Sequence, residues 1–123
     1  MDPIKISEAE MELLQLLWER SPLTAAQLSE SAPKKRGWQL ATVKTLLARL
    51  VAKGAVRAKA DGRRFLYSPA VDRAALAVEQ AERLIDRMFG GRVSPLVAQL
   101  AEQRELSPED LDELEALVRS LRS

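Results

Sequence analysis

A helix followed at once by a β-hairpin, predicted for residues 40–69, is the feature that most restricts the fold of this chain. Apolar residues recur over Leu40–Lys53 at the i, i+3, i+4, i+7 spacing of a core-facing helix, which Gly54 ends. They are Val43, Leu46, Leu47 and Leu50. Alternating residues on either side of Asp61-Gly62 then predict two short strands joined by a tight turn.

Two shorter helices are predicted before this pair of elements. Ser7 and Glu10 have the spacing of a capping box, and Thr24 and Gln27 repeat it, so a helix begins at each place. The buried stripe of the first helix is marked by Leu14, Leu17 and Trp18. Three helices and then a hairpin is the order of a winged helix-turn-helix. We therefore predict a mainly α fold with a small β-hairpin wing, with this domain at residues 1–70.

The outward side of the third helix is narrow and edged with cations. Small residues lie opposite the apolar stripe, and Lys44 and Arg49 flank them. These small residues are Ala41, Thr45, Ala48 and Ala52. Such a face fits closely against a nucleic-acid groove, although an ordinary solvated helix carries the same residue types. The helical wheel alone leaves both interpretations open.

The charge of the chain is divided unevenly along its length. Residues 1–70 hold 12 Lys/Arg and 7 Asp/Glu, whereas residues 71–123 hold 7 Lys/Arg and 11 Asp/Glu, so a net charge of +1 conceals a basic and an acidic half. Residues 34–64 contain one acid, Asp61, and ten basic side chains: Lys34, Lys35, Arg36, Lys44, Arg49, Lys53, Arg57, Lys59, Arg63 and Arg64. This concentration is typical of phosphate contact and favours nucleic-acid binding.

The absence of Cys and His excludes most catalytic and metal sites. Without them there are no disulfides, thiolate or imidazole ligands, cysteine nucleophiles or histidine acid-base groups. The remaining enzyme candidates are the carboxylates Glu109, Asp110, Asp112, Glu113 and Glu115. No nucleophile or phosphate-binding loop accompanies them, so we interpret them as helix N-terminal and solvated charges. We expect no enzyme activity, no cofactor and no metal.

The chain is expected to reside in the cytoplasm. No apolar run approaches the roughly 20 residues that cross a bilayer. Residues 1–5 also lack a basic segment followed by an apolar one, the pattern of a signal peptide.

Residues 71–123 are predicted to form a second, helical domain. One helix begins at the N-cap Asp72 and ends at Gly90-Gly91, another starts at Ser94-Pro95, and the last at Ser107-Pro108. Their apolar residues exceed what so short a segment can bury alone, so we expect two copies to pair through them. The alternative is that this stripe packs back on the winged helix of the same chain. The predicted dimerisation residues are Leu84, Ile85, Met88, Phe89, Val93, Leu96, Val97, Leu100, Leu114, Leu117, Val118 and Leu121.

The run from Trp38 to Gly54, WQLATVKTLLARLVAKG, resembles the penicillinase and methicillin-resistance repressor family, BlaI/MecI/CopY. The segments 6–18, 62–69 and 88–97 are similar to that family in the same order, so the resemblance covers nearly the whole chain. It implies a homodimer that binds a palindromic operator on double-stranded DNA through the third helix and wing and blocks transcription.

The resemblance also implies which residues contact DNA. Trp38, Thr42, Lys44, Thr45 and Arg49 fall on the family's DNA-contacting helix, and Arg63 and Arg64 fall on its wing. Lys53 and Lys59 join this set from the basic run. Arginine and lysine side chains can reach phosphate or guanine, and threonines can bond a phosphate or meet a thymine methyl. For Trp38, packing of the helix start and contact with DNA are both open.

Two departures bear on how such a repressor is released. The resemblance implies a partner membrane sensor that triggers cleavage in the dimerisation region, where antibiotic-resistance members have an Asn-Phe pair. At the corresponding place this chain has Gln99-Leu100, a departure that argues against release by that cleavage. The paired cysteines of copper-responsive members are absent, which excludes metal sensing by that route.

A second function compatible with the sequence is a protein-interaction module whose basic face meets an acidic partner. That alternative predicts weak, sequence-independent binding to DNA, whereas a repressor discriminates its operator from random DNA.

Overall fold

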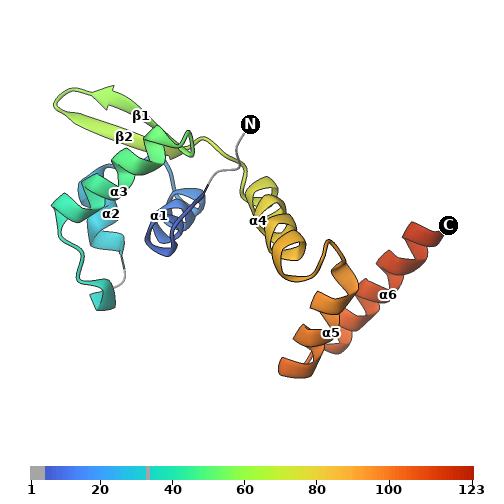
Figure 1. The fold of residues 1–123 in the computed structure, drawn as a ribbon. Helices are drawn as coiled ribbons and strands as arrows, with labels where there is room; N and C mark the ends of the chain where they lie inside the picture. Colours follow the sequence, from blue (N-terminus) through green and yellow to red (C-terminus); the bar gives the residue numbers. More distant parts are fainter. Residues whose placement is uncertain (1–4, 33) are drawn as a thin grey trace. The chain divides into compact units, whose positions relative to one another are not determined.

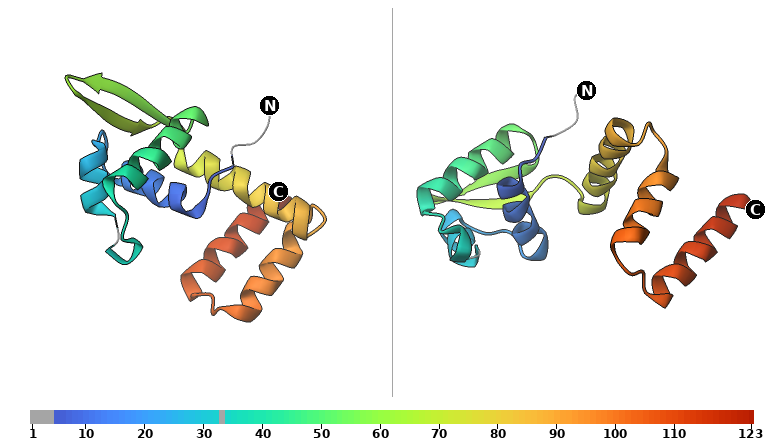
Figure 2. Two further views of the ribbon diagram at one scale, coloured as in Figure 1. Left: turned by 60° about the vertical axis from the view of Figure 1, so that its left-hand side comes forward. Right: turned by 60° about the horizontal axis from the view of Figure 1, so that its bottom comes forward.

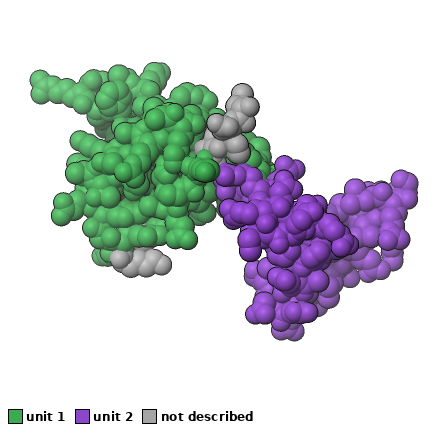
Figure 3. Space-filling model, viewed as in Figure 1, with its two compact units in different colours: residues 1–79 green, residues 80–123 purple. Residues whose placement is uncertain are grey.

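The computed structural model describes residues 5–32 and 34–123, except for the side chain of Lys35 (Figure 1). The chain divides into two compact units (Figure 3). We call the part up to Glu79 the head and Gln80–Ser123 the tail. The predicted mainly α fold with a hairpin wing is confirmed.

The first two helices begin where their capping boxes predict. In α1 (Glu8–Glu19), the Glu10 amide donates to Ser7 Oγ at 3.1 Å and the Ser7 amide donates back to Glu10 Oε1 at 3.1 Å. Thr24 and Gln27 make the same reciprocal pair at the start of α2 (Ala25–Ser31), with distances of 3.1 and 2.9 Å. Local sequence therefore determines both helix starts.

The third helix, α3 (Leu40–Ala52), also matches its prediction. Its four predicted core residues are all buried, and Lys53 is its C-cap. Gly54 follows with φ +78°, a left-handed conformation that ends the helix at little cost only for glycine. Pro33 and Gly37 in the sequence predict a non-helical connection between α2 and α3. The connection contains a 3₁₀ turn, η1 (Lys34–Arg36), which the Gly37 amide closes onto the Lys34 carbonyl at 3.1 Å.

Strands β1 (Val56–Asp61) and β2 (Arg64–Pro69) form the predicted antiparallel hairpin, which projects from the helices of the head (Figure 2). Asp61 pairs with Arg64, so the turn residues are Gly62-Arg63 instead of the predicted Asp61-Gly62. Gly62 is therefore the first turn residue, and its φ of +65° is the positive value that hairpin turns require there. Along β1 only Val56 is buried, because the rest of the strand extends beyond the core.

The core lies between α1, α2, α3 and the base of the wing. Leu23 joins the wing to the helices through two backbone bonds with Tyr67, of 3.0 and 2.8 Å. Trp18, expected on the buried stripe of α1, is half-buried, whereas Leu13, which was not predicted, is fully buried. The buried apolar residues are Leu13, Leu14, Leu17, Leu23, Ala25, Leu28, Val43, Leu46, Leu47, Leu50, Ala55, Val56 and Leu76.

Helix α4 (Arg73–Met88) begins in the head and ends in the tail. As predicted, Asp72 caps it, accepting from the Ala75 amide at 3.0 Å. Leu76 packs into the head core, and Trp18 Nε1 donates to the Val71 carbonyl at 3.1 Å. The boundary between the two compact units therefore falls within α4. A functional division after residue 70 stays a prediction.

The tail continues with α5 (Val93–Gln103) and α6 (Pro108–Arg122). The sequence predicts Pro95 as the first residue of α5, but the helix begins two residues earlier, at Val93. Pro95 is therefore the third helical residue, which costs no hydrogen bond because first-turn amides have no partner within a helix. Every residue of 80–123 is described, and none is buried. Among the described residues, no helix is long and apolar enough to cross a membrane.

Candidate nucleic-acid interface

The outward face of α3 is exposed along its whole length. Its side chains include the predicted contact residues Thr42, Lys44, Thr45 and Arg49, while the opposite side packs into the core. Three alanines, Ala41, Ala48 and Ala52, keep this face low between the longer side chains. A flat helical face edged by two cations can approach a major groove closely.

Thr45 has its hydroxyl directed back to its own helix. Its Oγ1 donates to the Ala41 carbonyl at 3.0 Å, one turn earlier. The hydroxyl proton is therefore engaged, and what remains for a partner is the methyl group and an acceptor lone pair. Of the two roles predicted for Thr45, contact with a thymine methyl fits this geometry better than donation to a phosphate.

The wing places two arginines at its turn. Arg64 Nε donates to Asp61 Oδ2 at 3.0 Å across the exposed hairpin end, which partly neutralises its charge. Arg63 and Lys59 are exposed and have no recorded anionic partner in the described part of the chain. The wing therefore offers free cations near its end, as phosphate contact requires.

A hollow of about 510 Å³ lies between the start of α3, the start of α2 and the wing. Lys44 and Arg63 line it together with Phe65, which is 52% exposed, and Leu40, which is 40% exposed. The hollow brings a predicted contact residue of α3 beside predicted contact residues of the wing. The two predicted contact elements therefore share one surface of the head.

Three of the ten basic side chains of residues 34–64 are paired within the head. Arg64 is the first. Arg36 contacts both carboxylate oxygens of Glu12, with Nη2 to Oε1 at 2.6 Å, and these hydrogen bonds raise the pKa of Arg36 above its ordinary value. Lys53 Nζ donates to Glu10 Oε1 at 2.7 Å and to the Lys5 carbonyl at 2.6 Å. Lys53 is therefore engaged with α1, apart from the outward face of α3.

Six basic side chains of this segment remain exposed without a recorded anionic partner among the described residues. They are Lys34, Lys44, Arg49, Arg57, Lys59 and Arg63. The side chain of Lys35 lies outside the described part. The basic surface is thus smaller than the sequence count suggests, and it is concentrated on α3 and the wing.

Trp38 stands just before α3 and is half-buried against the core. The guanidinium carbon of Arg36 lies 5.6 Å from the centroid of its ring, within the range of a cation–π contact. The structure therefore gives Trp38 a packing role at the start of α3, while contact with DNA through its exposed edge stays a prediction.

In the tail, the predicted dimerisation residues all lie at the surface or half-exposed. Leu84, Met88, Val93, Val97, Leu100, Leu114, Leu117, Val118 and Leu121 are exposed, and Ile85, Phe89 and Leu96 are half-buried. Leu114 and Leu117 line a shallow hollow of about 330 Å³ with Leu106, rimmed by Asp110 and Glu113. An apolar surface this extensive is typical of a protein–protein contact.

A family model described as "Penicillinase repressor" matches residues 6–120. The chain belongs to the penicillinase repressor family. The resemblance seen in the sequence is thereby confirmed. Among the relatives, the penicillinase repressor of Bacillus licheniformis is 29% identical over 110 residues, which make up 89% of this chain and 86% of that protein.

Solved structures of the family match the head. The DNA-binding domain of the repressor BlaI is 32% identical, with a TM-score of 0.53 over 59% of this chain and 89% of that domain. The monomeric form of Bacillus licheniformis BlaI in complex with the blaP half-operator is also 32% identical, with a TM-score of 0.50 over the same shares of the two chains. The winged-helix class of this penicillinase repressor family member is therefore confirmed.

Sequence reasoning missed the features that depend on contacts between elements. It identified Glu10 as a capping residue but not as a buried partner of Lys53, and it counted Arg36 and Lys53 among free cations. Nothing in the sequence marked Phe65 and Leu40 as exposed residues of a common hollow. The capping box is the one sequence signal at Glu10, and it does not indicate burial, because an exposed carboxylate completes the same box.

Proposed function

We propose that this chain is a sequence-specific DNA-binding transcriptional repressor that acts in the cytoplasm as a homodimer on a palindromic operator. Helix α3 enters the major groove, and the wing contacts the flanking backbone. The observation that carries this proposal is the surface shared by α3 and the wing, where Lys44, Arg49 and Arg63 are exposed without an anionic partner among the described residues. Similarity to the BlaI structure in complex with its half-operator supports it.

Specific residues of that surface have separate roles. Arg49 and Thr45 lie on the outward face of α3, where base edges would be read, with the arginine suited to guanine. Lys59 and Arg63 lie on the wing, where contacts to phosphate would add affinity without sequence information. Lys44 lines the hollow between α3 and the wing, where it can contact the DNA phosphates beside either element.

A second copy of the chain completes the proposal. The tail exposes Leu84, Met88, Leu117 and Leu121, and pairing them would remove this apolar area from water. Two heads joined in this way present two α3 helices, so the operator would be two-fold symmetric. Release by cleavage near Gln99-Leu100 would act on this pairing, since both residues are exposed on α5.

The testing experiment compares DNA from upstream of the coding sequence with random DNA of equal length, at fixed salt. A repressor binds its operator about a thousandfold more tightly or better. Arg49→Ala should weaken operator binding by about 1–3 kcal/mol with less effect on random DNA. Lys59→Ala should weaken both alike and flatten the salt slope by about one unit.

Arg20→Ala, an exposed cation at the end of α1, is the matched control and should leave both affinities unchanged. Equal and weak binding to both DNAs at every promoter tested would refute sequence-specific repression. That outcome would favour the protein-interaction alternative.

A further inference from the structure

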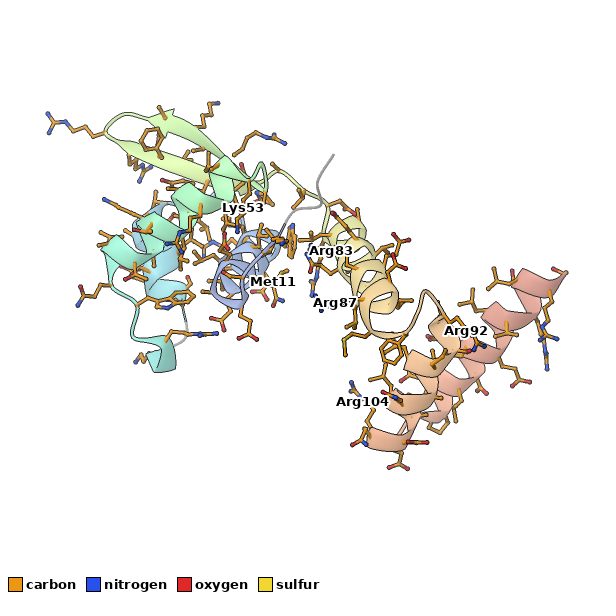
Figure 4. All side chains as sticks on the ribbon, in the orientation of Figure 1. Met11, Lys53, Arg83, Arg87, Arg92 and Arg104 are labelled. Carbon is orange, nitrogen blue, oxygen red and sulfur yellow. The ribbon has the colours of Figure 1, made fainter. Side chains whose placement is uncertain are left out.

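An ion pair between a buried carboxylate and a partly exposed lysine joins the start of α1 to the end of α3. The Glu10 side chain is 3% exposed and the Lys53 side chain 33%, and Lys53 Nζ lies 2.7 Å from Glu10 Oε1. Figure 4 labels Lys53 at the end of α3. The same ammonium donates to the Lys5 carbonyl at 2.6 Å, so Lys53 spends two of its three donors on the segment around the start of α1. These contacts connect residues more than 40 positions apart in the sequence.

The negative charge of Glu10 is not needed for its role in the helix cap. A capping box is completed by glutamine as well as by glutamate, as Gln27 does at the start of α2. Burial raises the pKa of Glu10, but hydrogen bonds from Lys53 and Ser7 and the charge of Lys53 outweigh it, so the net shift is downward. Glu10 Oε2 is also buried and has no hydrogen-bond partner among the described residues. A buried charge is costly to retain, and Lys53 is the cation that offsets this cost.

Lys53 occupies the junction between the two proposed contact elements. It is the C-cap of α3, and the chain then turns at Gly54 and enters β1 through the buried residues Ala55 and Val56. The Ala55 amide donates to the Leu50 carbonyl at 2.9 Å, and the Ala70 amide donates to the Ala55 carbonyl at 2.8 Å. A restraint at Lys53 therefore acts on the end of α3 and on both strands at the base of the wing.

We propose that Glu10 and Lys53 are positioning residues for operator recognition, and that Lys53 does not itself contact a DNA phosphate. The pair holds α3 and the wing at the relative orientation in which both meet the same DNA. This inference rests on the proposed function. It replaces the role in direct DNA contact that the sequence suggests for Lys53.

The experiment measures operator and random-DNA affinity, each over a range of salt concentrations, for wild type, Glu10→Gln and Lys53→Met. Glu10→Gln keeps the capping box and removes only the charge. Both variants should lose operator affinity by about tenfold or more with little change on random DNA, because a misplaced α3 spoils base contacts. Their salt slopes should equal that of wild type, since no phosphate contact is lost. Lys53→Arg, which keeps the cation, should restore most of the affinity.

Leu76→Ala is the control for general loss of stability. Leu76 is a buried residue of the head core that belongs to α4, so its truncation destabilises the head without changing a residue of α3, of the wing or of the ion pair. All affinities are measured below the onset of thermal unfolding of each variant. Leu76→Ala should then retain the operator preference that Glu10→Gln and Lys53→Met lose.

Two outcomes among the variants would overturn the inference. A salt slope reduced by about one unit in Lys53→Met but not in Glu10→Gln would make Lys53 a phosphate contact. A loss of operator preference in Leu76→Ala equal to that of the junction variants would make the pair merely structural. A wild-type protein that shows no operator preference is a separate result, because it refutes the proposed function and removes the inference with it.

Discussion

The head buries its apolar residues in a core, whereas the tail leaves them exposed or half-exposed in the single chain. In the head, α1, α2 and α3 bury their stripes against one another and against the base of the wing, so Leu13, Leu17 and Leu47 are fully excluded from water. In the tail, α5 and α6 are as regular and as amphipathic, yet none of their residues is buried. The same kind of helix thus makes a core in one unit and a surface in the other.

The polar residues of the two units differ in the same sense. The head uses a buried carboxylate, Glu10, to tie α1 to the end of α3. The tail has an exposed Glu115–Arg119 pair along one helix, with both side chains more than half exposed. An exposed pair one turn apart adds little stability, whereas a buried carboxylate that loses its cationic partner destabilises the fold strongly. The head therefore has a buried core of its own, whereas the apolar side chains of the tail stay exposed in the single chain.

The same substitution in each unit gives the largest expected contrast. Leu47→Ala should lower the free energy of unfolding of the head by about 2–5 kcal/mol, because it leaves a cavity among buried side chains. Leu117→Ala, at a residue 54% exposed in the single chain, should cost about 0.5 kcal/mol or less in dilute solution. Chemical denaturation at several protein concentrations measures both. A large, concentration-independent cost for Leu117→Ala would show that the tail has a core of its own.

Charge placed on the tail should break the pairing of two copies and leave the head folded. Leu84→Asp with Met88→Asp puts two carboxylates on the last turns of α4 and should weaken self-association by about a hundredfold or more. Sedimentation over a range of concentrations measures the association. The matched control, Leu84→Met with Met88→Leu, exchanges the same two side chains and should self-associate as wild type does. An unchanged mass for the aspartate variant would disprove this interface.

Low pH should destabilise the head through Glu10, and this effect should be smaller than the two above. The pKa of Glu10 is lower in the folded chain than its ordinary value of 4.5, so its ion pair stabilises the head above that value. This contribution is lost as the pH falls below about 4.5 through the lower folded pKa. Glu10→Gln should lack that part of the acid sensitivity of the head. Denaturation of both proteins at about pH 6 and about pH 3 measures the difference, and identical pH profiles would contradict the prediction.

Local features of the fold were predictable because they depend on residues close in sequence. Capping boxes at Ser7 and Thr24, the apolar stripe of α3 and the N-cap Asp72 all appear where they were predicted. Each arises from hydrogen bonds or periodicity within one helical turn or one helix. The turn of the wing was misplaced by one residue, because alternation sets the strands more firmly than it sets the loop between them.

By itself the sequence determined the family, the winged-helix order of elements and the outward face of α3, since a helical period assigns Lys44 and Arg49 to the side opposite the core. Only the tertiary structure decided which basic residues are free. Arg36 and Lys53 are removed from the basic surface by Glu12 and Glu10, which lie far away in the chain. Charge and periodicity are properties of residues and their neighbours, but pairing between distant side chains depends on how the helices pack.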